Sequence, residues 1–117
     1  MQHRITLKNL EQIFVGDINI VKQMLEIYFT SFDKQYHLLK ANYQSKNLIQ
    51  LKANLHSLKG MLSIFGVIDL LDLIKRLEGY CLNSQQNEID SLFATFCAEV
   101  EEFNTQLRQI QKELSDG

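Results

Sequence analysis

Residues 55–66 read LHSLKGMLSIFG, and this stretch decides the fold because its leucines recur at helical spacing. Upstream, Asn47 and Gln50 match the capping box that begins many helices. The apolar stripe that follows consists of Leu48, Leu51, Leu55, Leu58, Leu62 and Phe65. Steps of three and four place these side chains on one face, so the spacing predicts an amphipathic helix over residues 48–65 with that face in a core.

The rest of the chain repeats this pattern in three further segments. Apolar stripes predict helices over residues 18–43, 68–82 and 88–114, and Asn87 is the expected cap of the last. The stripes are Val21, Leu25, Tyr28, Phe32, Tyr36, Leu39 and Tyr43; Leu70, Leu73, Ile74, Leu77 and Cys81; and Leu92, Phe96, Val100, Phe103, Leu107, Ile110 and Leu114. A short helix over 6–15 is expected to begin at Thr6 and to end at a left-handed Gly16, with Asp17 capping the next helix.

These segments predict the fold class. Four long helices with short connections pack most simply as an antiparallel up-down-up-down four-helix bundle, with the short N-terminal helix across one end. The absence of proline from the sequence fits an all-α chain. With 117 residues, the chain is long enough for one core, so we expect a single domain over residues 1–117.

Composition excludes several classes of partner. The net charge is −2, with 12 Lys and Arg against 14 Asp and Glu, so no basic surplus attracts nucleic acid or anionic lipid. The apolar runs are too short for a membrane span, and the N-terminus lacks the apolar core of a signal peptide. We therefore expect a cytoplasmic protein, in which Cys81 and Cys97 are reduced core residues.

His56 interrupts the apolar pattern and is expected to face outward. At about 100° per residue, it lies roughly 130° from the centre of the stripe, and Gly60 lies almost opposite that centre. Lys59 and Ser63 follow at three and seven positions and share the same ridge. A glycine inside a helix costs about 1 kcal/mol relative to alanine, so Gly60 indicates that something approaches the backbone there.

Apolar residues surround this ridge. Ile49, Ala53 and Ile64 fall on the outward side of the helix, where charged residues are usual, and such patches mark contact surfaces. The alternative is that the short first helix covers Ile49 and Ile64 as ordinary packing. That helix would use Leu10, Ile13 and Phe14.

The residue types on the ridge suit an anion. A neutral imidazole offers a lone pair as a nucleophile, since its ordinary pKa of about 6.5 leaves it largely uncharged at neutral pH. The Lys59 ammonium and the Ser63 hydroxyl are donors to phosphoryl oxygens. No Asp or Glu lies within four residues of His56, and the chain has no glycine-rich nucleotide loop. The pattern therefore indicates a residue that holds a phosphoryl group without machinery to activate ATP.

His56-x-x-Lys59-Gly60 on the second long helix of a predicted bundle, with Gly66 ten residues after the histidine, resembles the histidine-containing phosphotransfer (HPt) domain of two-component phosphorelays. The similarity includes the entry pattern Leu10-x-x-Ile13-x-x-Gly16-Asp17 and the Leu77-Glu78 pair. The resemblance implies a phosphoryl carrier without kinase activity of its own. Nε2 of His56 would accept the group from an aspartyl phosphate of one response-regulator receiver domain and pass it to another.

The resemblance also implies roles for the neighbours of His56. Lys59 and Ser63 would stabilise the phosphoryl group, and Glu78 would hold Nδ1–H so that Nε2 stays free; the alternative for Glu78 is a solvated carboxylate at a helix end. A monomer would bind receiver domains or a hybrid sensor histidine kinase, with Mg²⁺ supplied by the receiver and no cofactor bound by this chain. The expected docking residues are Gly60, Ile49, Ala53, Ile64, Ile13 and Phe14. His3 and His37 match nothing in the pattern and are expected at the terminus and on a solvated helix face.

Three other interpretations compete with a phosphoryl carrier. A sensor-kinase dimerisation helix usually has an acidic residue after its histidine and a proline nearby, whereas Ser57 follows His56 here. A di-iron bundle needs Glu-x-x-His pairs, and Ala53 precedes His56 by three positions. An interaction-only bundle, in which the histidine has lost its role, is the remaining alternative.

Overall fold

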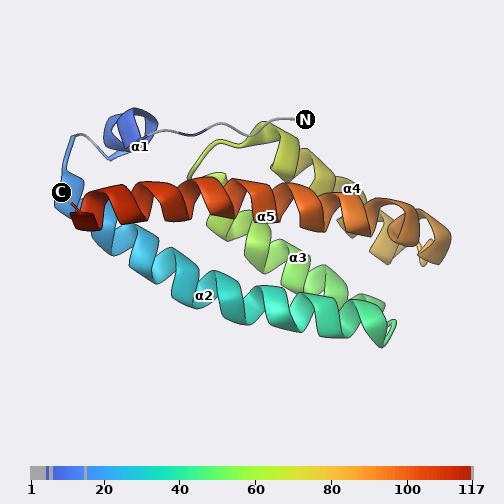
Figure 1. The fold of residues 1–117 in the computed structure, drawn as a ribbon. Helices are drawn as coiled ribbons and strands as arrows, with labels where there is room; N and C mark the ends of the chain where they lie inside the picture. The colour runs from blue at the N-terminus through green and yellow to red at the C-terminus, as the bar shows by residue number, and fades with distance from the viewer. Residues whose placement is uncertain (1–4, 6, 15, 117) are drawn as a thin grey trace.

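The computed structural model describes residues 5, 7–14 and 16–116 of the chain. The described residues are helical, contain no β-strand and form a bundle (Figure 1). The helices are α1 (Leu7–Ile13), α2 (Ile18–Gln44), α3 (Leu48–Ser63), α4 (Ile68–Leu82) and α5 (Gln86–Asp116). The pairs α2–α3, α3–α4, α4–α5 and α5–α2 pack against each other, which closes the ring of the expected up-down-up-down bundle.

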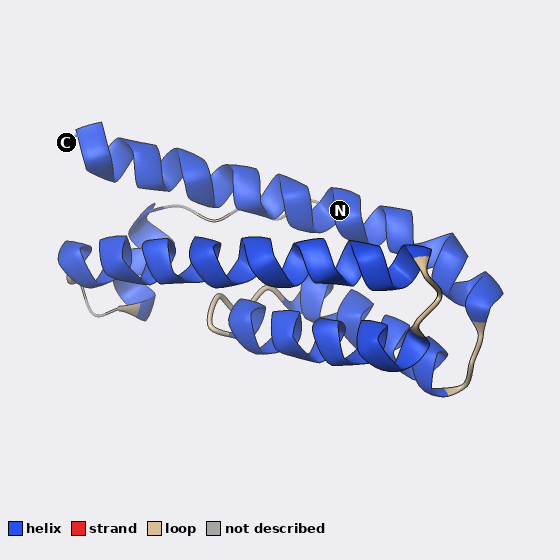
Figure 2. Ribbon diagram, turned by 90° about the horizontal axis from the view of Figure 1, so that it is seen from below, coloured by secondary structure: helices blue, strands red, loops and turns tan. Residues whose placement is uncertain are grey.

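The four bundle helices differ in length, and this sets the shape of the molecule. α2 has 27 residues and α5 has 31, whereas α3 has 16 and α4 has 15. The two long helices therefore extend past the α3–α4 pair at one end (Figure 2). α1 lies across this end, where α2 begins and α5 ends, and its Leu10 is fully buried (Figure 1). The short N-terminal helix thus covers core that the α3–α4 pair leaves open.

Local signals explain where the helices begin. Asp17 Oδ1 accepts hydrogen bonds from the backbone N–H groups of Asn19 at 3.0 Å and Ile20 at 3.2 Å. Asn47 Oδ1 accepts from Gln50 N at 3.2 Å in the same way. Side-chain caps of this kind satisfy helical N–H groups that have no partner inside the helix. Both expected caps are therefore confirmed.

The connections differ from the expected ones at several places. Gly16 has a φ of 76°, so the left-handed turn before α2 is confirmed. The expected cap at Thr6 lies outside the described residues, and the first helix is shorter than expected at its other end, because α1 ends at Ile13 and Phe14 is already in a turn. The prediction that Asn87 caps the last helix is wrong, because α5 already begins at Gln86. The chain turns at Ser84, which has a left-handed backbone conformation with a φ of 54°, and α5 follows directly after this turn. α3 likewise ends at Ser63, two residues before the expected end.

The core is built from the predicted stripes. Of the α3 stripe, Leu51, Leu55, Leu58, Leu62 and Phe65 are buried, and the α4 stripe is buried throughout. Both cysteines are free, with Cys81 buried and Cys97 partly buried. Side chains outside the predicted stripes are buried as well: Phe29, Ile89 and Phe93.

A polar network between α2 and α3 fixes how α3 is turned. Asn54 is buried, and its amide accepts a hydrogen bond from Asn42 Nδ2 at 2.7 Å and donates to Gln35 Oε1 at 3.2 Å. Asn54 lies two residues before His56, and two residues correspond to about 200° around a helix. Holding Asn54 against α2 therefore directs His56 away from the core.

Candidate functional site

His56 lies in the middle of α3 and points into solvent, with 75% of its side chain exposed. The outward direction follows from the burial of Leu55 and Leu58 on the opposite face of the helix. His37, the second described histidine, is exposed on α2. His3 lies outside the described residues.

Glu78 on α4 faces both His56 and Lys59. Its Oε2 lies 3.7 Å from His56 Nδ1, and its Oε1 accepts a hydrogen bond from Lys59 Nζ at 2.8 Å. Only 13% of the Glu78 side chain is exposed, so the interpretation of this residue as a solvated helix-end carboxylate is wrong. The packing of α3 on α4 brings together three polar side chains that span residues 56–78.

The position of Glu78 favours one of the two tautomers of a neutral His56 imidazole. A carboxylate beside Nδ1 attracts a proton to that nitrogen, which leaves the lone pair of a neutral ring on Nε2. At 3.7 Å the contact is longer than a hydrogen bond, so the attraction is electrostatic in this conformation. The exposed ring therefore presents a nucleophilic nitrogen to solvent.

Lys59 and Ser63, the two expected phosphate-stabilising residues, are both engaged within the protein. The ammonium group of Lys59 is paired with Glu78, as described above. The hydroxyl of Ser63 donates to the Gly60 carbonyl at 2.8 Å, which uses its single O–H donor. In this conformation Lys59 is still partly exposed beside His56, while the Ser63 donor is directed at the helix backbone.

Gly60 is exposed on α3, and the fold gives no reason for a glycine there. A Cβ at this position would meet no atom within 4 Å, and the φ of Gly60 is not positive. Alanine would fit without strain and would favour the helix. The fold by itself therefore does not require a glycine at this position.

Two hollows flank the α3 ridge. One, of about 770 Å³, runs along α3 and α4 and is lined by Ile49, Lys52, Ala53, His56 and Leu82, among others. The other, of about 220 Å³, lies between α2 and α3 and is almost wholly apolar. Its lining includes Met24, Ile27, Gly60, Met61 and Ile64.

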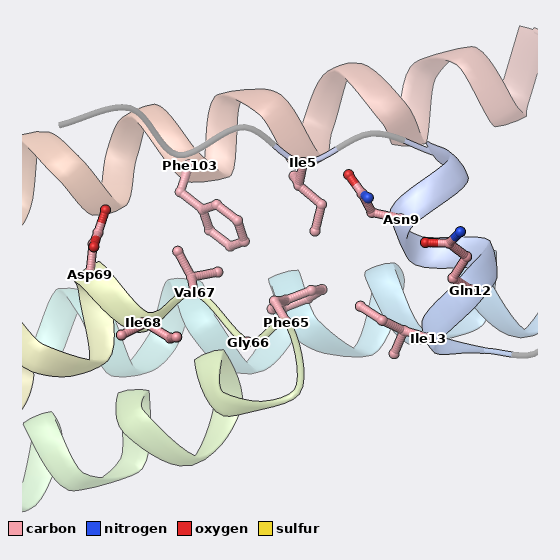
Figure 3. Close-up of a pocket in the computed structure, with 10 residues that line it drawn as sticks. All are labelled: Ile5, Asn9, Gln12, Ile13, Phe65, Gly66, Val67, Ile68, Asp69 and Phe103. Atoms are coloured by element: carbon pink, nitrogen blue, oxygen red, sulfur yellow. The ribbon is translucent and has the colours of Figure 1, made fainter.

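A third hollow, of about 560 Å³, lies at the end covered by α1 (Figure 3). It is bounded by Ile5, Ile13, Phe65 and Ile68, and Phe103 of α5 closes it from above in that view. His56 is not among its lining residues. This end of the bundle is therefore separate from the ridge that carries the histidine.

The structure divides the expected docking residues among these hollows. Ile49 and Ala53 share the α3–α4 hollow with His56, Gly60 and Ile64 belong to the α2–α3 hollow, and Ile13 lies in the third. Phe14 is partly buried against the core. Ile49 is 82% exposed and Ile64 is 45% exposed, so the alternative that the first helix covers them is wrong.

Sequence reasoning missed residues that line the two hollows beside His56. Lys52 precedes His56 by four positions, so the helical spacing that singled out Lys59 would also have found it. Met24, Ile27 and Leu82 come from neighbouring helices and give no such signal, because their place depends on how α2 and α4 pack on α3.

Burial also changes the chemistry of a thiol at this edge. It raises the pKa of Cys81 to about 11, and the Glu78 carboxylate adds to this increase while the Lys52 ammonium opposes it. Glu78 and Lys52 thus both lie within electrostatic range of Cys81.

In the described part of the chain, no group of three or more His, Cys, Asp or Glu side chains could hold a metal ion.

The described residues thus form a helical bundle that carries an exposed histidine with a carboxylate beside it. A family model described as "Hpt domain" matches residues 23–116, which include α3, α4, α5 and all but the first turn of α2. The chain therefore belongs to the Hpt family, whose members are phosphocarriers in two-component phosphorelays. Searches of curated proteins and of solved structures find no match.

The matched residues include His56, Lys59, Gly60 and Glu78. The entry pattern at residues 10–17, which formed part of the resemblance, lies outside the match, as does α1. No helix among the described residues is both long enough and apolar enough to cross a membrane.

Proposed function

We propose that His56 is the phosphorylated residue of this Hpt domain and that it passes phosphoryl groups between the receiver domains of response regulators. The observation that supports this most directly is the contact between His56 Nδ1 and Glu78 Oε2 on a side chain that is 75% exposed, because a carboxylate beside Nδ1 favours the tautomer of the neutral ring that has its lone pair on Nε2. The proposed partners are receiver domains or a hybrid sensor histidine kinase, and the chain acts as a monomer in the cytoplasm.

In the proposed transfer, the Nε2 lone pair attacks the phosphorus of an aspartyl phosphate on the receiver. The N–P bond forms as the P–O bond to the aspartate breaks, and the aspartate leaves with that electron pair as a carboxylate. Nδ1 keeps its proton, and the positive charge that develops on the ring is balanced by Glu78 at 3.7 Å. In the onward step a carboxylate oxygen of the second receiver attacks phosphorus, and Nε2 regains its lone pair.

The charges near His56 support this chemistry. Lys59 has two N–H donors beyond the one that it gives to Glu78, and these are available to phosphoryl oxygens. The Ser63 hydroxyl would have to leave the Gly60 carbonyl to reach the same group. In this proposal the receiver supplies Mg²⁺ and the acidic pocket that holds it, and this chain binds no cofactor.

The proposed receiver contact includes the apolar α2–α3 hollow. Gly60 removes a side chain next to the hollow and one turn from His56, so a partner can approach the backbone while its aspartate reaches Nε2. Ile27 and Ile64 are exposed at the hollow and would be covered by the partner. Ile49 and Ala53 lie nearer the start of α3 than His56 does, and a partner seated on the α2–α3 hollow would cover them only if it extended along α3.

Incubation of the protein with a phosphorylated receiver and Mg²⁺ tests the proposal. We expect an acid-labile, base-stable phosphate on the wild type and on His37→Gln, and none on His56→Gln. His37 is the matched control because it is also an exposed histidine on a bundle helix. Equal labelling of His56→Gln would reject the site, and absence of label from the wild type with every receiver of the source organism would reject transfer.

A further inference from the structure

The two lysines that flank His56 on α3 are in different electrostatic states. Lys59 is paired with the Glu78 carboxylate at 2.8 Å, so its charge is already compensated. Lys52 has no ion-pair or hydrogen-bond partner among the described residues. Lys59, the lysine of the motif, is thus paired, whereas Lys52, one turn before His56, is not paired with any described residue.

Helix geometry places Lys52 and His56 on the same face of α3. Residues four apart lie on one face of a helix, and a side chain on a helix leans over the turn that precedes it. The ring of His56 therefore leans towards the turn that contains Lys52. Consistent with this, both residues line the α3–α4 hollow.

The charge within this hollow is one-sided. Lys52 is its only Lys or Arg, and no Asp or Glu is found among the described residues that line it. Glu78 is not among the lining residues, and its carboxylate is paired with Lys59. A phosphoryl group on His56 carries between one and two negative charges at neutral pH and would meet a net positive charge on this side.

Moving Lys59 away from Glu78 and wholly onto the phosphoryl group would be costly. Glu78 is 13% exposed, and its ion-pair partners among the described residues are Lys59 at 2.8 Å and the His56 imidazole at 3.7 Å, of which only Lys59 carries a permanent charge. If Lys59 left, a largely buried carboxylate would face a phosphorylated histidine with no lysine beside it, and an unpaired charge of this kind is unfavourable. Lys52 can turn towards the phosphoryl group without breaking any pair.

We propose that Lys52 supplies the uncompensated positive charge that holds the phosphoryl group on His56, while Lys59 keeps Glu78 in place behind the imidazole. This inference rests on the proposed function, because it assumes that His56 is phosphorylated. It assigns to Lys52 a direct contact with the phosphoryl oxygens, and to Lys59 mainly the positioning of Glu78.

The test loads His56 without a receiver, so that it does not depend on docking. Phosphoramidate, a small phosphoryl donor, phosphorylates exposed histidines, and ³¹P NMR then follows the loss of phosphohistidine at neutral pH. We expect Lys52→Gln to lose the group about two to five times faster than the wild type, the range for a partly exposed charge pair. Added salt should shorten the wild-type lifetime more than that of Lys52→Gln, because the variant lacks one of the exposed charge interactions that salt screens.

Two variants serve as comparisons. Lys34→Gln removes the same charge from an exposed position on α2 and should behave as the wild type. Lys59→Gln should lower the melting temperature, because Glu78 loses its partner, and should shorten the lifetime less than Lys52→Gln does. A Lys52→Gln lifetime equal to that of Lys34→Gln, or a larger effect of Lys59→Gln, would overturn the proposal for Lys52. Failure of the proposed function appears separately, as the absence of receiver-dependent labelling of the wild type.

Discussion

Glu78 Oε1 lies 2.8 Å from Lys59 Nζ, which ties the motif lysine on α3 to a carboxylate on α4 rather than leaving it in solvent. The same carboxylate reaches towards His56 through its other oxygen. Lys59 and His56 are therefore linked through a residue from a different helix. This link gives the motif lysine a structural role in addition to any contact with phosphate.

Replacing Lys59 by alanine should affect both stability and transfer. Glu78 would lose its closest partner while remaining largely buried, and we expect the free energy of unfolding to fall by about 1 kcal/mol, since Lys59 itself is partly exposed. Transfer from a phosphorylated receiver should slow while the helical circular dichroism spectrum is retained. Urea unfolding and rapid-quench labelling measure the two effects, and unchanged values of both would leave Lys59 as an ordinary surface lysine.

The substitution Glu78→Gln should change the protonation pattern of His56. It keeps the shape of the side chain but removes the charge that attracts a proton to Nδ1. Two-bond ¹⁵N–¹H correlation spectra above pH 8 report the tautomer of a neutral imidazole. We expect wild-type His56 to hold its proton mainly on Nδ1 and the variant to move towards the ratio of the exposed His37.

The same spectra contain their own control. His37 should show identical signals in both proteins, because it lies on α2 and no interaction with Glu78 is found for it. A His56 tautomer ratio that is already that of His37 in the wild type would contradict the positioning role of Glu78.

Substitution of Gly60 should separate folding from docking. Because a Cβ would meet nothing within 4 Å, Gly60→Ala should stabilise the helix by about 0.5–1 kcal/mol. Gly60→Gln should be at least as stable as the wild type but bind receivers more weakly, since its longer side chain occupies the approach to the α2–α3 hollow. Thermal unfolding and calorimetric titration with a receiver test this, and undiminished binding by Gly60→Gln would remove Gly60 from the docking surface.

Stability should fall in alkaline solution through the buried thiol of Cys81. Its pKa is raised from 9.0 to about 11, so the folded state holds the proton more tightly than the unfolded chain. The stabilising contribution is therefore complete below pH 9 and is lost as the pH rises through about 11. Cys81→Ala should flatten this part of the stability profile measured by urea unfolding between pH 8 and 11; an unchanged slope would contradict the assignment.

Much of the fold could be predicted because it depends on interactions between residues that are close in the sequence. The leucines of the α3 stripe and the caps at Asp17 and Asn47 act within one or two helical turns, and the structure has them as expected. The cap at Asn87 was predicted wrongly because the turn before α5 is at Ser84. That residue adopts a left-handed conformation, which is usually indicated by a glycine. Asn54 was not recognised as buried because its partners, Asn42 and Gln35, lie on another helix.

In the candidate site, too, some features follow from the sequence alone and others depend on how the helices pack. The outward direction of His56 and the open position of Gly60 follow from the angle of each residue around α3, which the sequence alone defines. The expected docking residues do not form one surface, because Ile13 and Ile49 line different hollows. Periodicity gives a direction around one helix axis but not the position of that helix relative to the others.

By itself, the sequence determined that this chain is a helical bundle, that His56 faces solvent and that the surrounding residues suit a phosphoryl group. Only the tertiary structure decided that Lys59 is bound to Glu78, that Lys52 pairs with no described residue and that an apolar hollow opens beside Gly60. The physical reason is that hydrophobic periodicity acts along one chain segment. The pairing of charges and the shape of a hollow depend instead on distances between helices, which are set only when all the stripes pack together.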